Sequence, residues 1–161
     1  MTAFDAFIDW LLGPDIEGGY VNDPNDPGGE TKFGIAKRYH PDVDIKNLTR
    51  GGAVLIYAAQ YWAPIHGDDL PPGVAFITAD AAVNESVETA IHFLQRAVGV
   101  AVDGVIGPAT LAAAKVDPLA TLLEIAARRM VAYAEDPNEP RFEVGWARRL
   151  MSCVHAALAQ T

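Results

Sequence analysis

The 161-residue sequence contains a single cysteine, Cys153, which rules out an intrachain disulfide and a cysteine-based zinc site. Positive charge is also scarce, because 12 Lys and Arg residues face 21 Asp and Glu residues and leave a formal net charge of −9. This balance argues against general nucleic-acid binding and against adsorption to an anionic membrane surface. No uncharged apolar run approaches the roughly 18 residues of a membrane span, so we expect no stable membrane insertion.

The first residues lack the marks of a secretory signal. Residues 1–12 carry Asp5 and Asp9 but no Lys or Arg, whereas a signal peptide needs a basic start and a longer apolar stretch. Their apolar residues recur at three- and four-residue spacing, which predicts an amphipathic helix capped by Thr2 and ended by the Gly-Pro pair at 13–14. We therefore expect synthesis in the cytoplasm without a signal peptide.

Composition and periodicity predict a mainly helical globular protein. Half of the residues are apolar and 20% are charged, which is typical of a folded chain rather than a disordered one. No convincing strand pattern occurs outside a Gly- and Pro-rich stretch. We therefore expect a mainly α fold with a small β or irregular element near residues 20–35 and a short hairpin around Gly28-Gly29. Helical patterns cover about residues 4–12, 50–62, 74–84, 87–98, 108–115, 118–133 and 141–159.

Chemistry is most strongly indicated in the first 30 residues, which hold seven carboxylates and no Lys or Arg. Mutual repulsion and desolvation would raise the pKa of a partly buried member, as a general acid near neutral pH requires. Glu17 is the best candidate, because it follows the first helix and precedes Gly18 and Gly19, which leave room for a polymer alongside. The seven are Asp5, Asp9, Asp15, Glu17, Asp23, Asp26 and Glu30.

Plainer interpretations of this segment stay open. A Glu before two glycines is often an ordinary helix-end residue, and an acidic loop is often only solvated surface. Calcium binding by residues 23–30 is a further option, but the EF-hand pattern fails because Pro27 and Gly34 occupy two of its ligand positions. We therefore expect no metal site and no cofactor.

The segment from Glu17 to Ile35 closely resembles the signature of the glycoside hydrolase family 108 muramidases, which are phage endolysins and related bacterial lysozymes. It carries the motif EGGY, then D-P-G-G-x-T, then a G-I pair. The resemblance implies a largely helical, lysozyme-like fold and a peptidoglycan hydrolase that cleaves the β-1,4 bond between N-acetylmuramic acid and N-acetylglucosamine. By motif position it implies Glu17 as general acid, Asp26 as second carboxylate and Thr31 as a polar residue that helps to place the water.

The second half of the chain resembles the peptidoglycan-binding module that usually follows this catalytic domain. Phe93–Val100 and Val102–Leu111 carry the resemblance. It implies a catalytic region at 1–85 and a helical peptidoglycan-binding module at 86–161, packed as one compact unit. The implied partner is the glycan strand of peptidoglycan in the periplasm or cell wall, reached through a holin or another export route. We expect a monomer, because cleaving a cross-linked mesh needs no partner subunit.

Several residues are candidates for substrate binding, each with a structural alternative. Tyr20, Tyr61 and Trp62 could stack on sugar rings, although core packing explains such aromatics equally well. Asn84 could hydrogen-bond an acetamido group or serve as a polar helix residue. Gln95 could touch the glycan or have a structural role. The full set is Gly18, Gly19, Tyr20, Tyr61, Trp62, Asn84 and Gln95.

The final helical segment carries two adjacent arginines and the single cysteine. We interpret Arg148 and Arg149 as partners of nearby acids such as Glu143 or Glu135. We expect Cys153 to be a small buried hydrophobic residue.

Two other function classes stay open at this point. A non-catalytic peptidoglycan-binding or assembly protein would keep the fold without the activity, but it would not need Glu17, Asp26 and Thr31 together. A chitinase-like glycanase would act on N-acetylglucosamine polymers, since lysozyme-like folds host both activities.

Overall fold

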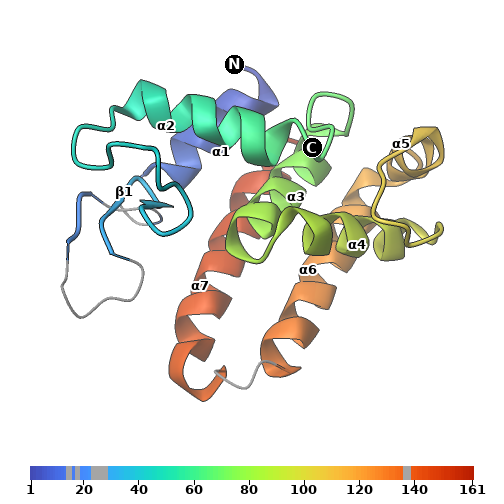
Figure 1. Ribbon diagram of the computed structural model, residues 1–161. Helices are drawn as coiled ribbons and strands as arrows, with labels where there is room; N and C mark the ends of the chain where they lie inside the picture. Colours follow the sequence, from blue (N-terminus) through green and yellow to red (C-terminus); the bar gives the residue numbers. More distant parts are fainter. Residues whose placement is uncertain (14–15, 17–18, 23–28, 136–138) are drawn as a thin grey trace.

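The computed structural model describes residues 1–13, 16, 19–22, 29–135 and 139–161, and this part of the chain is mainly helical (Figure 1). The expected mainly α architecture with one small β element is therefore confirmed. The elements are α1 (Ala3–Leu11), β1 (Thr31–Lys32), β2 (Ile35–Ala36), α2 (Arg50–Tyr57), the π-helix η1 (Ala58–Trp62), α3 (Pro72–Asn84), α4 (Val87–Val98), α5 (Pro108–Ala114), α6 (Pro118–Glu135) and α7 (Glu139–Leu158).

Helix α1 begins and ends where the sequence predicts. The Thr2 hydroxyl accepts a 3.1 Å hydrogen bond from the Asp5 backbone N–H, and the Asp5 carboxylate accepts a 2.8 Å bond from the Thr2 N–H. This reciprocal capping box satisfies two N–H groups that the first turn would otherwise leave without a partner. The helix buries Phe7 and Leu11 completely, and it stops just before the Gly-Pro pair.

The small sheet is a two-stranded antiparallel hairpin in which Thr31 lies opposite Ala36. Its turn consists of Phe33 and Gly34, with φ of 53° and 74°. Positive φ at both central positions is the type I′ geometry that matches the twist of a short hairpin. We predicted the turn at Gly28-Gly29; Gly28 lies outside the described residues, and the hairpin of the described part turns later because Gly34 supplies one of the two positive-φ positions.

The segment predicted as one helix over 50–62 has two parts. Thr49 caps α2, since its hydroxyl accepts a 3.1 Å bond from the Gly52 N–H. From Ala58 the chain continues as the π-helix η1, which the sequence pattern did not indicate. The wider turn ends at Trp62, whose side chain lies in the core.

Helix α3 is the centre of the molecule (Figure 1). Every residue from Gly73 to Ala82 is buried, and α1, η1, α4, α6 and α7 all pack against it. A helix that is apolar on all sides needs such complete cover. Helices α6 and α7 run antiparallel and project together below α3 (Figure 1).

Helix boundaries in the second half follow the sequence closely. Helix α4 spans the predicted 87–98 and is capped by Ser86, whose hydroxyl accepts a 3.0 Å bond from the Thr89 N–H. We expected this helix over about residues 74–84, but α3 already begins at Pro72, because a proline is tolerated in the first turn of a helix. Within the described residues, no helix is both long enough and apolar enough to cross a bilayer.

Candidate active site

The predicted catalytic residues belong to the segment that joins α1 to β1. Glu17, Gly18 and Asp26 lie outside the described residues, so their roles stay predictions. Residues 16, 19–22 and 29–31 flank them and are described. These flanking positions show what surrounds the predicted acid.

Thr31 is held at the start of β1 by backbone pairing on two sides. It pairs with Ala36 across the hairpin and with Val21 in an isolated antiparallel bridge, whose two N–H···O bonds measure 2.8 and 2.9 Å. The bridge therefore pairs two residues that lie on either side of Asp26 in the sequence, Val21 and Thr31. The Thr31 hydroxyl makes a long, 3.5 Å contact with the carbonyl oxygen of Gly29, so its oxygen keeps acceptor positions for a water.

The hairpin is fixed to the helical part of the protein through its turn. The hydroxyl of the buried Tyr57 on α2 donates a 2.8 Å hydrogen bond to the carbonyl oxygen of Phe33. The bond supports Phe33, which has a positive φ although it is not a glycine. This backbone conformation is uncommon for residues with a side chain. The position of Thr31 is therefore defined relative to the helices.

Gly19 and Tyr20 lie on the surface directly after the EG pair of the motif. A side chain at Gly19 would meet no atom of the described residues within 4 Å, so this part of the chain leaves space for a large ligand at this position. Tyr20 is 41% exposed, and its hydroxyl donates a 2.7 Å bond to Glu30. The bond to Glu30 raises the pKa of Tyr20 and fixes the direction of the exposed ring.

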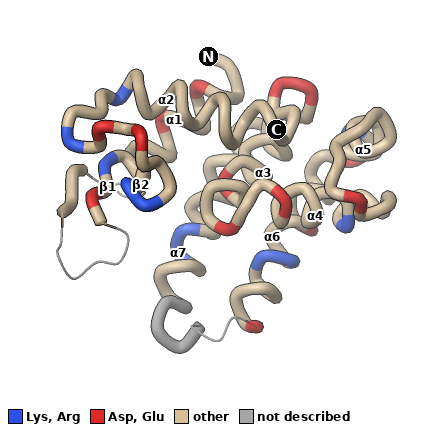
Figure 2. The backbone as a smooth tube through the Cα atoms, in the orientation of Figure 1, with Lys and Arg blue, Asp and Glu red and all other residues tan. Residues whose placement is uncertain are grey.

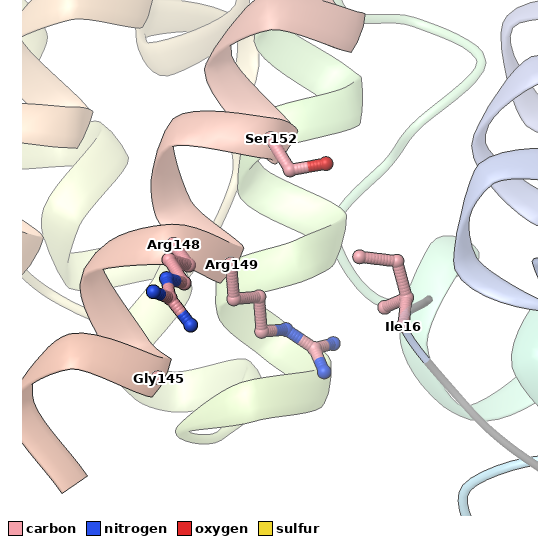
Figure 3. A pocket seen from close by; sticks show the side chains of 5 residues that line it. All are labelled: Ile16, Gly145, Arg148, Arg149 and Ser152. Carbon is pink, nitrogen blue, oxygen red and sulfur yellow. The ribbon is translucent and has the colours of Figure 1, made fainter. Parts of the chain in front are cut away.

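A pocket of about 500 Å³ lies between the end of the α1 region and α7. Ile16 forms one side, and Gly145, Arg148, Arg149 and Ser152 line the side of α7 (Figure 3). Glu17 is the next residue in the chain after Ile16. The pocket therefore adjoins the segment to which the sequence assigns the acid.

The predicted aromatic binding residues of η1 differ in their surroundings. Trp62 is 4% exposed, packs against Phe4 and Phe7 with ring centroids 5.2 and 5.9 Å away, and donates a 3.0 Å bond to Asp68. Trp62 is therefore a core residue in this structure. Core packing was the alternative to sugar stacking that the sequence left open. Tyr61 is half-buried beside Tyr57, with 5.4 Å between the ring centroids.

Asn84 and Gln95 are engaged inside the protein. The Asn84 amide donates a 3.0 Å bond to the Tyr133 hydroxyl, between α3 and α6. Gln95 is 1% exposed; its amide donates to Asp103 and accepts from the Gly104 N–H, at 2.7 and 3.0 Å. These contacts give Gln95 a structural role, because from α4 it binds the backbone and Asp103 of the loop at 103–105, which covers it.

A buried charge cluster joins α3, α6 and α7. Arg129 has no exposed surface, and it donates to Asp80 at 2.8 Å, to Glu85 at 3.1 Å and to the Tyr133 hydroxyl at 2.9 Å. Arg149 contacts the second oxygen of Asp80 at 2.9 and 3.0 Å. The cluster thus balances two acids with two arginines, as buried charges require.

The cluster shifts the protonation of its members. Burial raises the pKa of Glu85 and outweighs the attraction of Arg129. Burial alone would lower the pKa of Arg129, but the charges of Asp80 and Glu85 overcome this effect and raise it. Burial and the nearby Asp80 raise the pKa of Cys153, which keeps this residue a buried thiol, in agreement with the sequence analysis.

The sequence analysis did not find this cluster. It assigned Arg149 to acids such as Glu143 or Glu135, whereas the arginine pairs with Asp80 on α3. The available signal was Asp80 itself, a single carboxylate within a stretch that is otherwise apolar on every face of a helix. Such a residue needs a cationic partner from another element. Among the described residues, no group of His, Cys, Asp and Glu side chains is arranged to hold a metal ion.

A buried central helix, a surrounding set of helices and a pocket beside an acidic segment together define a lysozyme-like protein. The comparisons identify the family: residues 13–85 match the model of Glycosyl hydrolase 108, and residues 89–151 match the model described as a Predicted Peptidoglycan domain. The chain belongs to the glycosyl hydrolase 108 family. The two matches support a peptidoglycan-degrading function, carried out by a glycosidase.

Solved structures resemble the chain, and SagA does so over nearly its whole length. SagA from Brucella abortus is 34% identical, with a TM-score of 0.86 over 98% of this chain and 94% of that chain. No curated protein sequence matches the chain. The fold and the family are therefore established, and the bond that is cleaved is the subject of the proposal below.

Proposed function

We propose that the protein is an N-acetylmuramidase, which hydrolyses the β-1,4 bond between N-acetylmuramic acid and N-acetylglucosamine in peptidoglycan. In this proposal residues 1–85 carry the chemistry and residues 86–161 bind the polymer. The observation that supports it most directly is the pocket of about 500 Å³ between Ile16 and α7, because Ile16 directly precedes Glu17 of the family motif.

The proposed chemistry uses two carboxylates and one hydroxyl. Protonated Glu17 donates its proton to the glycosidic oxygen as the bond breaks, and the sugar develops oxocarbenium character. Asp26 acts on the opposite face of the sugar, either as the base that activates water or as the nucleophile. Thr31 holds the water through its hydroxyl, since its backbone is fixed by the bridge to Val21 and by the hairpin.

The site also supports a role for the surface next to the acid. Gly19 leaves the open space that a glycan strand needs, and Tyr20 presents an exposed ring on which a sugar can stack. Trp62 and Gln95 are not part of this proposed surface, because both are buried.

We further propose that the protein works as a monomer on peptidoglycan in the periplasm or cell wall. A holin or another export route would bring it there. Lysis of a host by a phage and local opening of the wall for particle release or secretion both use this activity.

The test is digestion of purified Gram-negative peptidoglycan by the wild type and by Glu17→Gln. The products are reduced with borohydride and identified by mass spectrometry. We expect reduced muramitol ends from the wild type and none from Glu17→Gln. Anhydro-muramic ends would instead show a lytic transglycosylase, and an absence of products from the wild type would support a binding protein without catalysis.

A further inference from the structure

The pocket between Ile16 and α7 has a positively charged wall in an acidic protein. The chain carries a net charge of −9, yet among the described residues the charged side chains that line this pocket are Arg148 and Arg149 (Figure 3). Figure 2 shows this basic stretch on α7, apart from the basic stretch on α6. These two arginines attract anions, whereas the net charge of the whole chain repels them.

Among the helix arginines whose side chains the structure describes, Arg148 and Arg96 form no ion pair with a described carboxylate, and only Arg148 lines this pocket. Arg149 is held from behind by Asp80. For Arg148, which is exposed, no carboxylate among the described residues forms an ion pair. Its guanidinium group thus keeps a fork of N–H donors for a carboxylate that arrives from outside. Ion pairs within the described part join Arg50 to Asp9, Arg128 to Glu124, Arg129 to Asp80 and Glu85, and Arg149 to Asp80.

The other residues that line the pocket leave space beside the Arg148 side chain. Gly145 lies one helical turn before Arg148 and Arg149 and presents only backbone to the pocket. Ser152 accepts a 3.0 Å bond from the indole N–H of Trp10, which ties α7 to α1 across the pocket floor. Ile16 supplies an apolar wall on the opposite side. The result is a space with one apolar side and one cationic side.

We infer that Arg148 binds a carboxylate of the peptidoglycan stem peptide. The inference rests on the proposed function, because it takes the pocket to be part of the cleft that holds the glycan. Stem peptides carry carboxylates and are attached to the muramic acid residues of the strand, whereas a polymer of N-acetylglucosamine alone carries none. Arg148 thereby selects peptide-bearing glycan over chitin-like glycan, in a protein whose net charge gives no such preference.

The test measures binding rather than cleavage. Sacculi are prepared in two forms, native and with their carboxylates converted to neutral amides by carbodiimide and methylamine. Binding of Arg148→Ala, Arg148→Lys and the wild type to both forms is measured by sedimentation, with all three carrying Glu17→Gln so that the sacculi stay intact. Lys115→Ala, which removes one exposed positive charge beside α5, is the matched control.

We expect Arg148→Ala to bind native sacculi about tenfold more weakly, since a hydrogen bond to a charged group is lost. Arg148→Lys should recover part of this loss, and Lys115→Ala should bind like the parent. Amidation should weaken the parent by a similar factor and leave Arg148→Ala unchanged.

Two results would overturn the inference. Either Arg148→Ala binds native sacculi as well as the parent, or it loses affinity equally on native and amidated sacculi. Failure of the proposed function is recognised separately, since it appears in the digestion assay as product formation by Glu17→Gln or as a lack of products from the wild type.

Discussion

Carboxylates occur in two contrasting settings in this protein. In the first 30 residues seven of them accompany no Lys or Arg. Of the three described members, Asp5 and Asp9 lie at the surface and Glu30 is half-buried. In the helical interface, Asp80 and Glu85 are paired with Arg129 and Arg149, and Arg129 has no exposed surface. The paired acids join α3, α6 and α7, whereas we propose that Glu17 and Asp26 of the acidic segment act in catalysis. Substitutions in the helical interface should therefore lower the stability of the fold, whereas substitutions of the proposed catalytic acids should lower the rate of cleavage.

The largest effect on stability is expected for Arg129→Met, which removes the cation from the buried cluster. Asp80 and Glu85 would lose their shared partner, and breaking a buried ion pair on one side costs about 3–5 kcal/mol. Urea denaturation should show this loss in the free energy of unfolding. Arg128→Met is the matched control, because its ion pair with Glu124 is 36% and 44% exposed and should contribute less than about 1 kcal/mol. Equal stability of the two variants would contradict the contrast between the regions.

A medium effect is expected for Gly67→Ala, which tests whether Trp62 belongs to the core or to the binding surface. A Cβ at position 67 would overlap the indole ring of Trp62. Overpacking of this kind costs about 1–3 kcal/mol, measurable by urea denaturation, while binding to sacculi should stay unchanged. Gly51→Ala is the control, because the nearest atom is 3.9 Å away and alanine should stabilise α2 by roughly 0.5–1 kcal/mol. Lost binding with intact stability would return Trp62 to the substrate surface.

The smallest effect is the pH dependence contributed by Glu85, which is surrounded by Arg129, Asp80, Asn84 and Tyr133. Its pKa is raised in the folded protein because burial outweighs the attraction of Arg129. The folded state therefore binds this proton more tightly than the unfolded state, and the contribution of Glu85 to stability falls as the pH rises from 4.5 through the folded pKa.

The measurement compares the free energy of unfolding of the wild type and Glu85→Gln at a series of pH values. The wild type should lose stability relative to Glu85→Gln across that window, and the difference should be constant above it. Glu88→Gln, at an exposed position of α4, should show no such trend. A difference that does not vary with pH would show that Glu85 has its ordinary protonation in the folded protein.

Local features of the fold followed from the sequence because their causes are local. The cap at Thr2, the cap at Thr49 and the span of α4 depend on hydrogen bonds and apolar spacing within a few residues. The family motif likewise stands in one continuous run after Glu17. These features could be predicted without knowing which helices and strands pack against one another.

Features that depend on contacts between distant elements did not follow from the sequence. The π-helical segment ends at Trp62, which packs against Phe7 of α1, and the bond that Arg149 donates to Asp80 joins residues 69 positions apart. The structural role of Gln95 depends on the position of the loop at 103–105. Only the folded chain decides which polar side chains face a ligand and which face another helix.

The most direct test of the account is the rate of peptidoglycan cleavage by Glu17→Gln, measured together with its free energy of unfolding. Glu30→Gln is the matched control, because Glu30 occupies the variable position of the D-P-G-G-x-T motif in the same acidic segment. We predict that Glu17→Gln loses about 10²–10⁴-fold in rate with unchanged stability, as removal of a general acid should, and that Glu30→Gln stays close to the wild type. Cleavage by Glu17→Gln at the rate of Glu30→Gln would contradict the assignment of the acid.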